Sequence, residues 1–354
     1  MHLRVLALTA LLTALPGCAV KIDRYLVNGP IGEALALPDV DLACRSANGT
    51  VPLAESLVGK TKSWRARVIL SVTAGVCAQE AAMEAELEAE RALYWLDGEA
   101  RLGAVKDARA VERRHRTRSA ARGWRAFQLM EEAIGPIGAD DGSCPKLAKK
   151  EEELAYFIGI VGGANALLDD QAGGGQVGIP VDLLRQVGRA SRCLDDERWW
   201  GVPTAIEASV WAMVPGTAPD GVDPWTALDE AASRGEAQGV HIARAMHARV
   251  AANAGNDAQV RKAIAAFESE TPAPPPGIAL LEDYGRLIAQ HEADLVWTRA
   301  RGYRAESLGP LPGDGDSTAA GSGGDDPFEG DPFAEDPFAT DEPDDTDTPD
   351  PETP

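Results

Sequence analysis

The hydrophobic and polar positions of this chain follow a helical pattern along most of its length. Residues 79–96 are rich in alanine, glutamate, leucine and methionine and contain no glycine or proline, which strongly favours a helix. Residues 64–68 alternate like a strand, but no partner strand is found, so we interpret them as the start of a helix that continues through Val76. Further helices are predicted over residues 107–134, 147–170, 181–194, 203–214, 224–234, 239–253, 257–269 and 277–302.

Prolines and aspartates mark where these segments begin or end. Asp223 and Asp257 are suited to cap helix N-termini, because a short carboxylate accepts hydrogen bonds from the free amides of the first turn. About ten helices with short connections and no convincing strand predict an all-α domain of stacked antiparallel helical hairpins. Prolines lie at predicted starts or stops at Pro136, Pro145, Pro180, Pro203, Pro215 and Pro224.

The N-terminus indicates export. Residues 5–15 form an apolar run that is too short to span a bilayer, which needs roughly 20 residues. The run is followed by Pro16-Gly17-Cys18, which resembles the site cleaved by lipoprotein signal peptidase, so a diacylglycerol is expected on Cys18. The alternative is an ordinary secretory signal with an unmodified cysteine. Ala19 is not the aspartate that retains lipoproteins at the inner membrane, which favours the periplasmic face of the outer membrane.

Export changes the interpretation of the other cysteines, because an oxidising compartment permits disulfides. An even number remains after Cys18, none with C-x-x-C spacing and none with a histidine at ligand spacing, so zinc is not expected. Three pairings are open, and four free thiols are an alternative. The disulfide candidates are Cys44, Cys77, Cys144 and Cys193.

The charge of the chain is concentrated at its C-terminal end. All 34 Lys and Arg lie at or before Arg304, whereas 16 of the 56 acidic residues follow it, so the body carries 34 − 40 = −6 and the last 50 residues carry −16. This segment repeats Asp-Pro-Phe three times at a spacing of five residues, from Asp326. We expect residues 305–354 to form a disordered acidic tail whose removal leaves the stability of the body nearly unchanged.

Motifs for catalysis or cofactor binding are not supported by their context. Residues 173–178 match G-x-G-x-x-G, but they follow a predicted helix rather than the strand that a dinucleotide site requires. No Gly-x-Ser-x-Gly elbow and no H-E-x-x-H string is present. Arg114, Arg118, Arg122 and Arg125 fall on one helical face, which in an exported protein favours a solvated face or ion pairs over nucleic acid, with a surface for an acidic partner as a further alternative. We therefore expect no enzyme, no cofactor and no metal.

The order of these segments resembles the TRAP transporter T-component family, helical lipoproteins built from degenerate tetratricopeptide-like hairpins. In that family a Leu-Asp-x-x-Tyr/Phe-x-Gly corner precedes a helix that ends in proline. Leu194, Asp195 and Gly201 fit this corner, with the Trp199–Trp200 pair in the aromatic place and one residue of extra spacing. The resemblance covers about residues 50–302, but Tyr156-Phe157 replaces the usual Tyr-Trp pair and the acidic tail is outside the family pattern.

The resemblance implies a periplasmic accessory protein that binds the solute-binding component of a TRAP-type uptake system, an apolar ligand being a further expectation, and that forms a homo-oligomer. The alternative is a general tetratricopeptide-like scaffold for envelope assembly or secretion. Of the tryptophan pair, one is expected to pack in the core. Trp200, with Gly159, Gly162 and Gly163, is proposed to face a partner or an apolar channel, with tight helix packing as the other explanation of the glycines. The expected organisation is a signal peptide at 1–17, an anchored segment at 18–50, a helical domain at 51–304 and the tail at 305–354.

Overall fold

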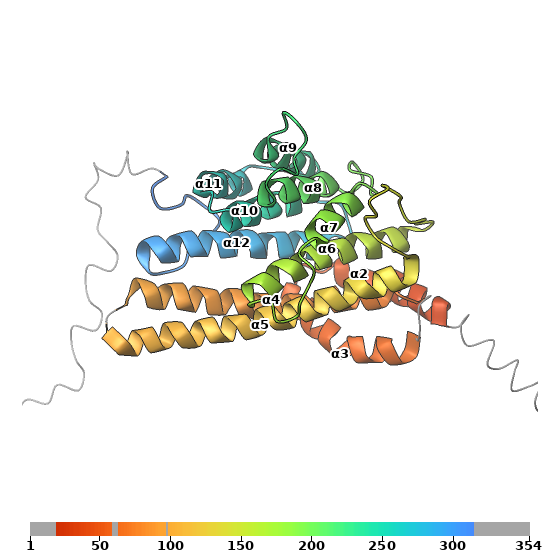
Figure 1. Ribbon diagram of the computed structural model, residues 1–354, viewed down its shortest axis with the longest axis horizontal. Coiled ribbons are helices and arrows are strands. Elements are labelled where there is room, and N and C mark those ends of the chain that lie inside the picture. Colours follow the sequence, from red (N-terminus) through yellow and green to blue (C-terminus); the bar gives the residue numbers. More distant parts are fainter. Residues whose placement is uncertain (1–18, 59–62, 97, 315–354) are drawn as a thin grey trace, which may run out of the picture. The chain divides into compact units, whose positions relative to one another are not determined.

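The computed structural model describes residues 19–58, 63–96 and 98–314, and within them every regular element is a helix (Figure 1). The predicted all-α class is confirmed. The signal peptide, Cys18 and the three Asp-Pro-Phe repeats lie outside the described residues.

The helices match the predicted segments to within a few residues, except that the segment predicted from residue 107 begins earlier. The two predicted pieces on either side of residue 78 form one continuous helix, α4. The main helices are α3 Val40–Val58, α4 Arg65–Tyr94, α5 Gly98–Ile134, α6 Lys150–Ala172, α7 Leu183–Ser191, α8 Val202–Met213, α9 Pro224–Glu236, α10 Ile242–Asn253, α11 Asp257–Ala265 and α12 Ala279–Arg301. Shorter turns are η1 Val27–Ile31, α2 Gly32–Leu35 and η2 Ala266–Glu268.

Helix starts follow from side-chain caps. Asp223 accepts a hydrogen bond from the amide of Thr226 at 2.8 Å, and Pro224 occupies the first helical position of α9, as predicted. At α11 the cap is Asn256, one residue before the predicted Asp257, and its side chain accepts from the amide of Gln259. An asparagine oxygen serves this position as well as a carboxylate does, which explains the shift.

Consecutive helices pack against one another along the chain. The longest pair is α4 and α5, of 30 and 37 residues, which lie side by side in Figure 1. Helix α12 returns to this pair and packs on both α4 and α10, so it lies between the long hairpin and the group α8–α11 (Figure 1). This return places residues near 80 and near 284 side by side. The repeat character of the array stays a prediction.

The N-terminal segment belongs to the helical unit. Helix α3 runs through the boundary expected between residues 50 and 51. Val27 and Ile31 are buried in the main core, and the carboxylate of Asp23 accepts a hydrogen bond from the amide of Ala66 at 2.9 Å. Because these contacts cross the expected boundary, residues 19–58 and α4 belong to one packed unit.

The C-terminal boundary of the helical unit lies later in the chain than the sequence predicts. The compact unit extends to Pro312, rather than ending at Arg304. Leu311 is buried in a core cluster with residues of α10 and α12, and the amide of Ala305 donates to Asp294 at 3.1 Å. The apolar side chain of Leu311 explains why this stretch packs although it precedes an acidic segment.

Two disulfides link segments of the described chain, one between two helices and one between two connecting segments. Cys44 on α3 pairs with Cys77 on α4, with their Cα atoms 5.4 Å apart, and Cys144 pairs with Cys193, at 5.5 Å. The structure therefore selects one of the three pairings left open by the sequence. The second bridge ties the loop before α6 to the corner after α7.

By length and composition alone, helix α4 is long and apolar enough to cross a membrane. Half of its most apolar 18-residue stretch is buried inside the fold. It packs against α3, α5, α6 and α12. A core helix of a helical bundle has the same composition, because it is covered on all sides.

Candidate ligand-binding cavity

The tryptophan corner between α7 and α8 is a packed turn. Trp199 is buried, stacks on Phe157 with ring centroids 4.4 Å apart, and its indole N–H donates to Glu153 at 2.7 Å. Trp200 is half-buried and packs edge-on against Trp199. The expectation that one tryptophan enters the core is met by Trp199.

The backbone explains the shape of this corner. Trp200 has a φ of 52°, and Gly201 follows with 79°, so two successive residues adopt the left-handed conformation. A Cβ atom at Gly201 would lie 2.2 Å from the carbonyl oxygen of Ala231 on α9. The turn thus brings the start of α8 directly against α9, and Trp200 is held in a conformation unusual for a bulky residue.

The three glycines proposed for a partner surface lie inside the fold. A Cβ at Gly159 would meet Met130, at Gly162 it would meet Val72, and at Gly163 it would meet Phe127, each at 2.4 to 2.6 Å. Gly159 and Gly163 therefore permit close packing of α6 on α5, the other explanation that the sequence allowed. Gly162 additionally borders a cavity.

This cavity, of about 110 Å³, lies where α3, α4, α5, α6 and α12 meet. Its lining is mostly aliphatic, and every lining residue is buried or half-buried. Small residues on α4, α5 and α6 leave the space because they do not fill the gap between the helix backbones. The lining is formed by Leu35, Val40, Ala43, Val72, Thr73, Gly75, Val76, Gln79, Ser119, Gly123, Phe157, Ile158, Val161, Gly162, Asn165, Ala166, Ile242, Leu280, Leu281 and Tyr284.

A polar bridge crosses one wall of the cavity. The hydroxyl of Tyr284 on α12 donates to Gln79 on α4 at 2.7 Å and accepts from the side-chain amide of Asn165 on α6 at 3.2 Å. Burial raises the pKa of Tyr284 to about 12, so the hydroxyl stays protonated at neutral pH. Three helices far apart in sequence thus present hydrogen-bonding groups to an apolar space.

A second apolar cavity, of about 60 Å³, lies on the other side of this bridge, between α6, α7, α8, α10 and α12. The two cavities share Val161, Asn165, Ile242 and Tyr284.

A buried charged network adjoins the second cavity through Arg249. Arg116 on α5 donates to Asp169 at 2.9 Å and to Glu86 at 2.8 Å, and Glu86 also contacts His291. Burial raises the pKa of Glu86, but the hydrogen bond from His291 and the nearby positive charges outweigh it and lower the pKa to about 2. This network fixes α4, α5, α6 and α12 around the cavities.

One constellation has the geometry of a catalytic triad. The hydroxyl of Thr271 lies 3.3 Å from Nε2 of His241, whose Nδ1 lies 2.5 Å from Glu282. The same carboxylate accepts from the backbone amide of His241 at 2.8 Å, the residue that precedes α10. Glu282 thereby satisfies an otherwise free amide at a helix start, which is a structural role. We assign this group to capping.

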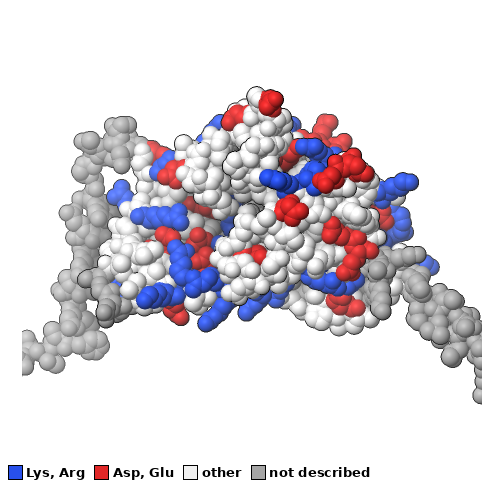
Figure 2. All heavy atoms as spheres, viewed as in Figure 1, with Lys and Arg blue, Asp and Glu red and all other residues white. Residues whose placement is uncertain are grey.

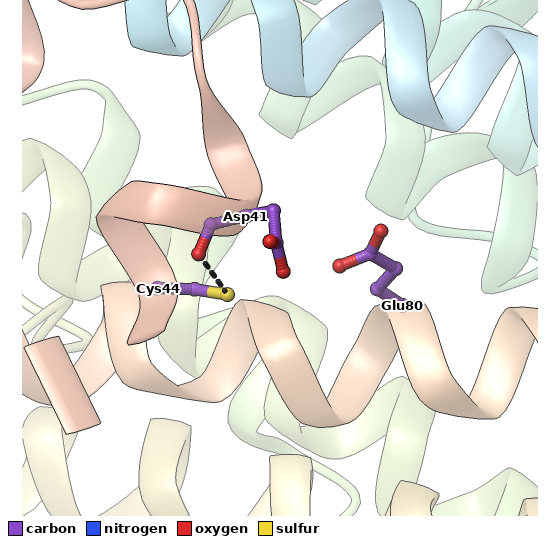
Figure 3. Close-up of side chains that lie close together, drawn as sticks. All are labelled: Asp41, Cys44 and Glu80. Atoms are coloured by element: carbon purple, nitrogen blue, oxygen red, sulfur yellow. Dashed lines mark hydrogen bonds between the residues drawn. The ribbon is translucent and has the colours of Figure 1, made fainter. Parts of the chain in front are cut away.

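Asp41, Cys44 and Glu80 are close enough together to suggest a metal site (Figure 3). The sulfur of Cys44 is bonded to Cys77, so it offers no thiolate to a metal. It also carries no proton, so its contact of 3.4 Å with the carbonyl oxygen of Asp41 is not a hydrogen bond. Asp41 is paired with Arg45 at 2.5 Å. Burial and the neighbouring carboxylates raise the pKa of Glu80, which reflects crowding of negative charge rather than a completed ligand set.

Comparisons of this chain with family models, with curated proteins and with solved structures find no match. The resemblance to the T-component family therefore rests on the order of the segments and on the tryptophan corner.

Proposed function

We propose that this protein is a lipid-anchored binding component of the cell envelope that holds a small apolar ligand in the cavity where α3, α4, α5, α6 and α12 meet. The observation that carries the proposal is the apolar space with one hydrogen-bonding bridge, Gln79–Tyr284–Asn165, in its wall. The volume is close to that of an engineered apolar cavity of about 150 Å³ that binds benzene, so a compact hydrocarbon body fits a space of this size.

The bridge defines the chemistry of the ligand. Tyr284 supplies a hydroxyl, and Asn165 and Gln79 supply amide groups, while the remaining wall is largely aliphatic. A ligand with an aromatic or branched alkyl body and a single neutral polar group fits this combination. In this proposal the protein binds its ligand and transforms no substrate.

The place of the protein in the envelope rests on the sequence. The lipoprotein signal and the family resemblance support association with the solute-binding component of a TRAP-type uptake system, at the periplasmic face of the outer membrane. Substitution Cys18→Ala removes the thiol that would carry the lipid, so the variant is expected to lose both the lipid anchor and labelling with a fatty-acid probe. Persistent labelling of the variant would contradict the anchor.

The cavity can be tested with a small probe. Val76 on α4 is half-buried and lines the cavity, so Val76→Phe fills the space and Val76→Ala enlarges it. Fluorobenzene binding, followed by fluorine NMR on the mature chain, should be lost in Val76→Phe and retained in Val76→Ala. Thermal unfolding of both variants reports whether they are folded. Equal binding by both folded variants would show that the cavity is not the site.

The partner is tested by crosslinking and recovery from native membranes, comparing the wild-type chain with Trp200→Ala. We expect a periplasmic solute-binding protein to be recovered with the wild-type chain. Trp200 is half-buried, so a matched measurement of unfolding separates loss of the partner from loss of the fold. Recovery of secretion or wall-assembly proteins alone would favour the general scaffold instead.

A further inference from the structure

The exposed apolar side chains of the described residues are unevenly distributed. Helices α6 to α11 and their loops expose only Val181 and Val222 among large hydrophobic residues. The others lie in the N-terminal segment and α3, or at the end of the α4–α5 hairpin and beside it. These are Ile22, Tyr25, Leu37, Leu42, Leu53, Leu93, Tyr94, Trp95, Leu96, Leu102 and Tyr303.

The end of the α4–α5 hairpin, residues 93–96 and 102, is the denser group, and we call it the apolar tip. Trp95 is 52% exposed and its ring packs edge-on against Tyr94. The indole N–H points to the carbonyl oxygen of Gly302 at 3.4 Å, which brings the end of α12 beside the tip. An indole with one anchored polar atom and an exposed ring is typical of a membrane interface.

A row of cations continues from the apolar tip along α5. The row consists of Lys106, Arg113, Arg114 and Arg118, all exposed, and none of them forms an ion pair with another described residue. It spans about 18 Å, from the rise of 1.5 Å per residue. We call it the basic row. Figure 2 shows Lys and Arg gathering over this part of the surface.

Two exposed acids lie at the basic row, Asp107 within it and Glu88 on α4, which lines the same groove as Asp107 and pairs with Arg91 at 3.2 Å. Glu112 is buried and paired with Arg109 at 2.9 Å. Burial and then the charge of Arg118 lower the pKa of His115 and of Arg122 on the same helix. The contribution of Arg118 to both shifts is that of a nearby positive charge on the same helix.

We propose that the apolar tip and the basic row together form a second contact of this protein with an anionic membrane surface. The aromatic and leucine side chains of the tip enter the interfacial region, and the cations of the row lie at the level of the lipid phosphates. This contact requires neither the acyl chain on Cys18 nor the ligand cavity.

A membrane fits these residues better than a protein partner does. The proposed contact combines a small apolar group at the end of the α4–α5 hairpin with cations that extend away from it along α5, which runs along the lower part of the helical unit in Figure 1. A typical protein interface buries about 800 Å² on each partner as one compact patch. A membrane surface is continuous in the lateral direction, so it contacts a small apolar group and a separate line of cations at the same time.

The net charge of −22 does not prevent this contact. Charges separated by more than about 8–10 Å are largely screened at physiological ionic strength, so the potential next to the membrane is set by the basic row. The contact should therefore weaken as salt is added.

The test uses the full mature chain with Cys18→Ser, which carries no acyl group. Its sedimentation with phosphatidylcholine vesicles is measured with and without phosphatidylglycerol. Binding is expected only with the anionic lipid. Replacement of two exposed cations by Arg114→Ser and Arg118→Ser should weaken it about 25-fold, at roughly fivefold for each charge.

The matched control removes two cations elsewhere, by Lys150→Ser and Arg185→Ser on α6 and α7. Both are exposed and neither has an ion-pair partner among the described residues. This variant should bind as the wild-type chain does. Equal weakening in both double variants would show that only net charge matters and would overturn the proposal, as would the absence of binding to anionic vesicles.

A second readout concerns the apolar tip. Lipids brominated in the upper part of the acyl chain should quench the fluorescence of the wild-type chain more than that of Trp95→Phe, because Trp95 is the exposed tryptophan of the described residues. Identical quenching of the two chains would show that the tip does not enter the bilayer, and would remove that half of the contact.

Discussion

The carboxyl group of Glu292 on α12 allows the energetics of the buried network to be measured. Glu292 is 3% exposed, and one of its carboxylate oxygens lies 3.5 Å from Nε of Arg249 on α10. Burial raises the pKa of Glu292 from 4.5 to about 7, against the opposing charge of Arg249. The folded chain therefore holds a proton at this site more tightly than the unfolded chain does.

The sign of the pH dependence follows from this difference. Between pH 4.5 and pH 7 the folded state binds more protons than the unfolded state, so this group lowers the free energy of unfolding as the pH rises. The penalty is complete above the folded pKa. A difference of about 2.5 pKa units corresponds to about 3 kcal/mol at pH 8 and to less than about 1 kcal/mol at pH 5.

Substitution Glu292→Gln imitates the protonated side chain at every pH. The variant should be more stable than the wild-type chain by about 3 kcal/mol at pH 8, and the gain should shrink below about 1 kcal/mol at pH 5. Urea unfolding followed by tryptophan fluorescence at the two pH values measures the difference. Glu270→Gln, at an exposed loop position, is the control and should change stability little at either pH. A variant that is less stable at pH 8, or a gain independent of pH, would refute the assignment of a costly buried carboxylate.

Two further predictions concern the boundary of the fold and the packing of its helices. Truncation after Arg304 removes the buried Leu311 and should cost about 2–3 kcal/mol in urea unfolding, whereas truncation after Pro312 should leave stability unchanged; equal values for both would place the boundary at Arg304. Gly163→Ala should lower stability by about 1–3 kcal/mol, because its Cβ would lie 2.6 Å from the Phe127 ring. Gly103→Ala, with nothing within 4 Å, should raise it by up to about 1 kcal/mol, and the same sign for both in thermal unfolding would contradict close packing at Gly163.

Much of the helical structure is predictable because its signals are local. The cap at Asp223 with Pro224 behind it marks the start of α9 without reference to any other part of the chain. Residues 64–68 are different, because their local pattern alternates like a strand and only the lack of a partner strand elsewhere in the chain favoured the helix that α4 forms from Arg65. The N-terminal segment was missed, since its helices are held by contacts such as Asp23 with Ala66 rather than by a distinct local pattern.

The candidate site was only partly predictable, because its residues come from distant segments. Gly162 was singled out for its small size, but the same signal also marked Gly159 and Gly163, which serve packing. Tyr284 and Gln79 are 205 positions apart and neither carries a motif. Tyr284 gave one usable signal, as a polar aromatic residue inside a predicted helix.

The sequence by itself determined the helical class, the approximate helix limits and the four cysteines that were candidates for disulfides, since each depends on composition or on residues within a few positions of one another. The tertiary structure decided which cysteines pair, which tryptophan is buried, and where the cavities and the charged network lie. These features depend on how α12 returns to α4 and α10, and that return is set by the packing of whole helix faces, for which no short stretch of the chain carries the information.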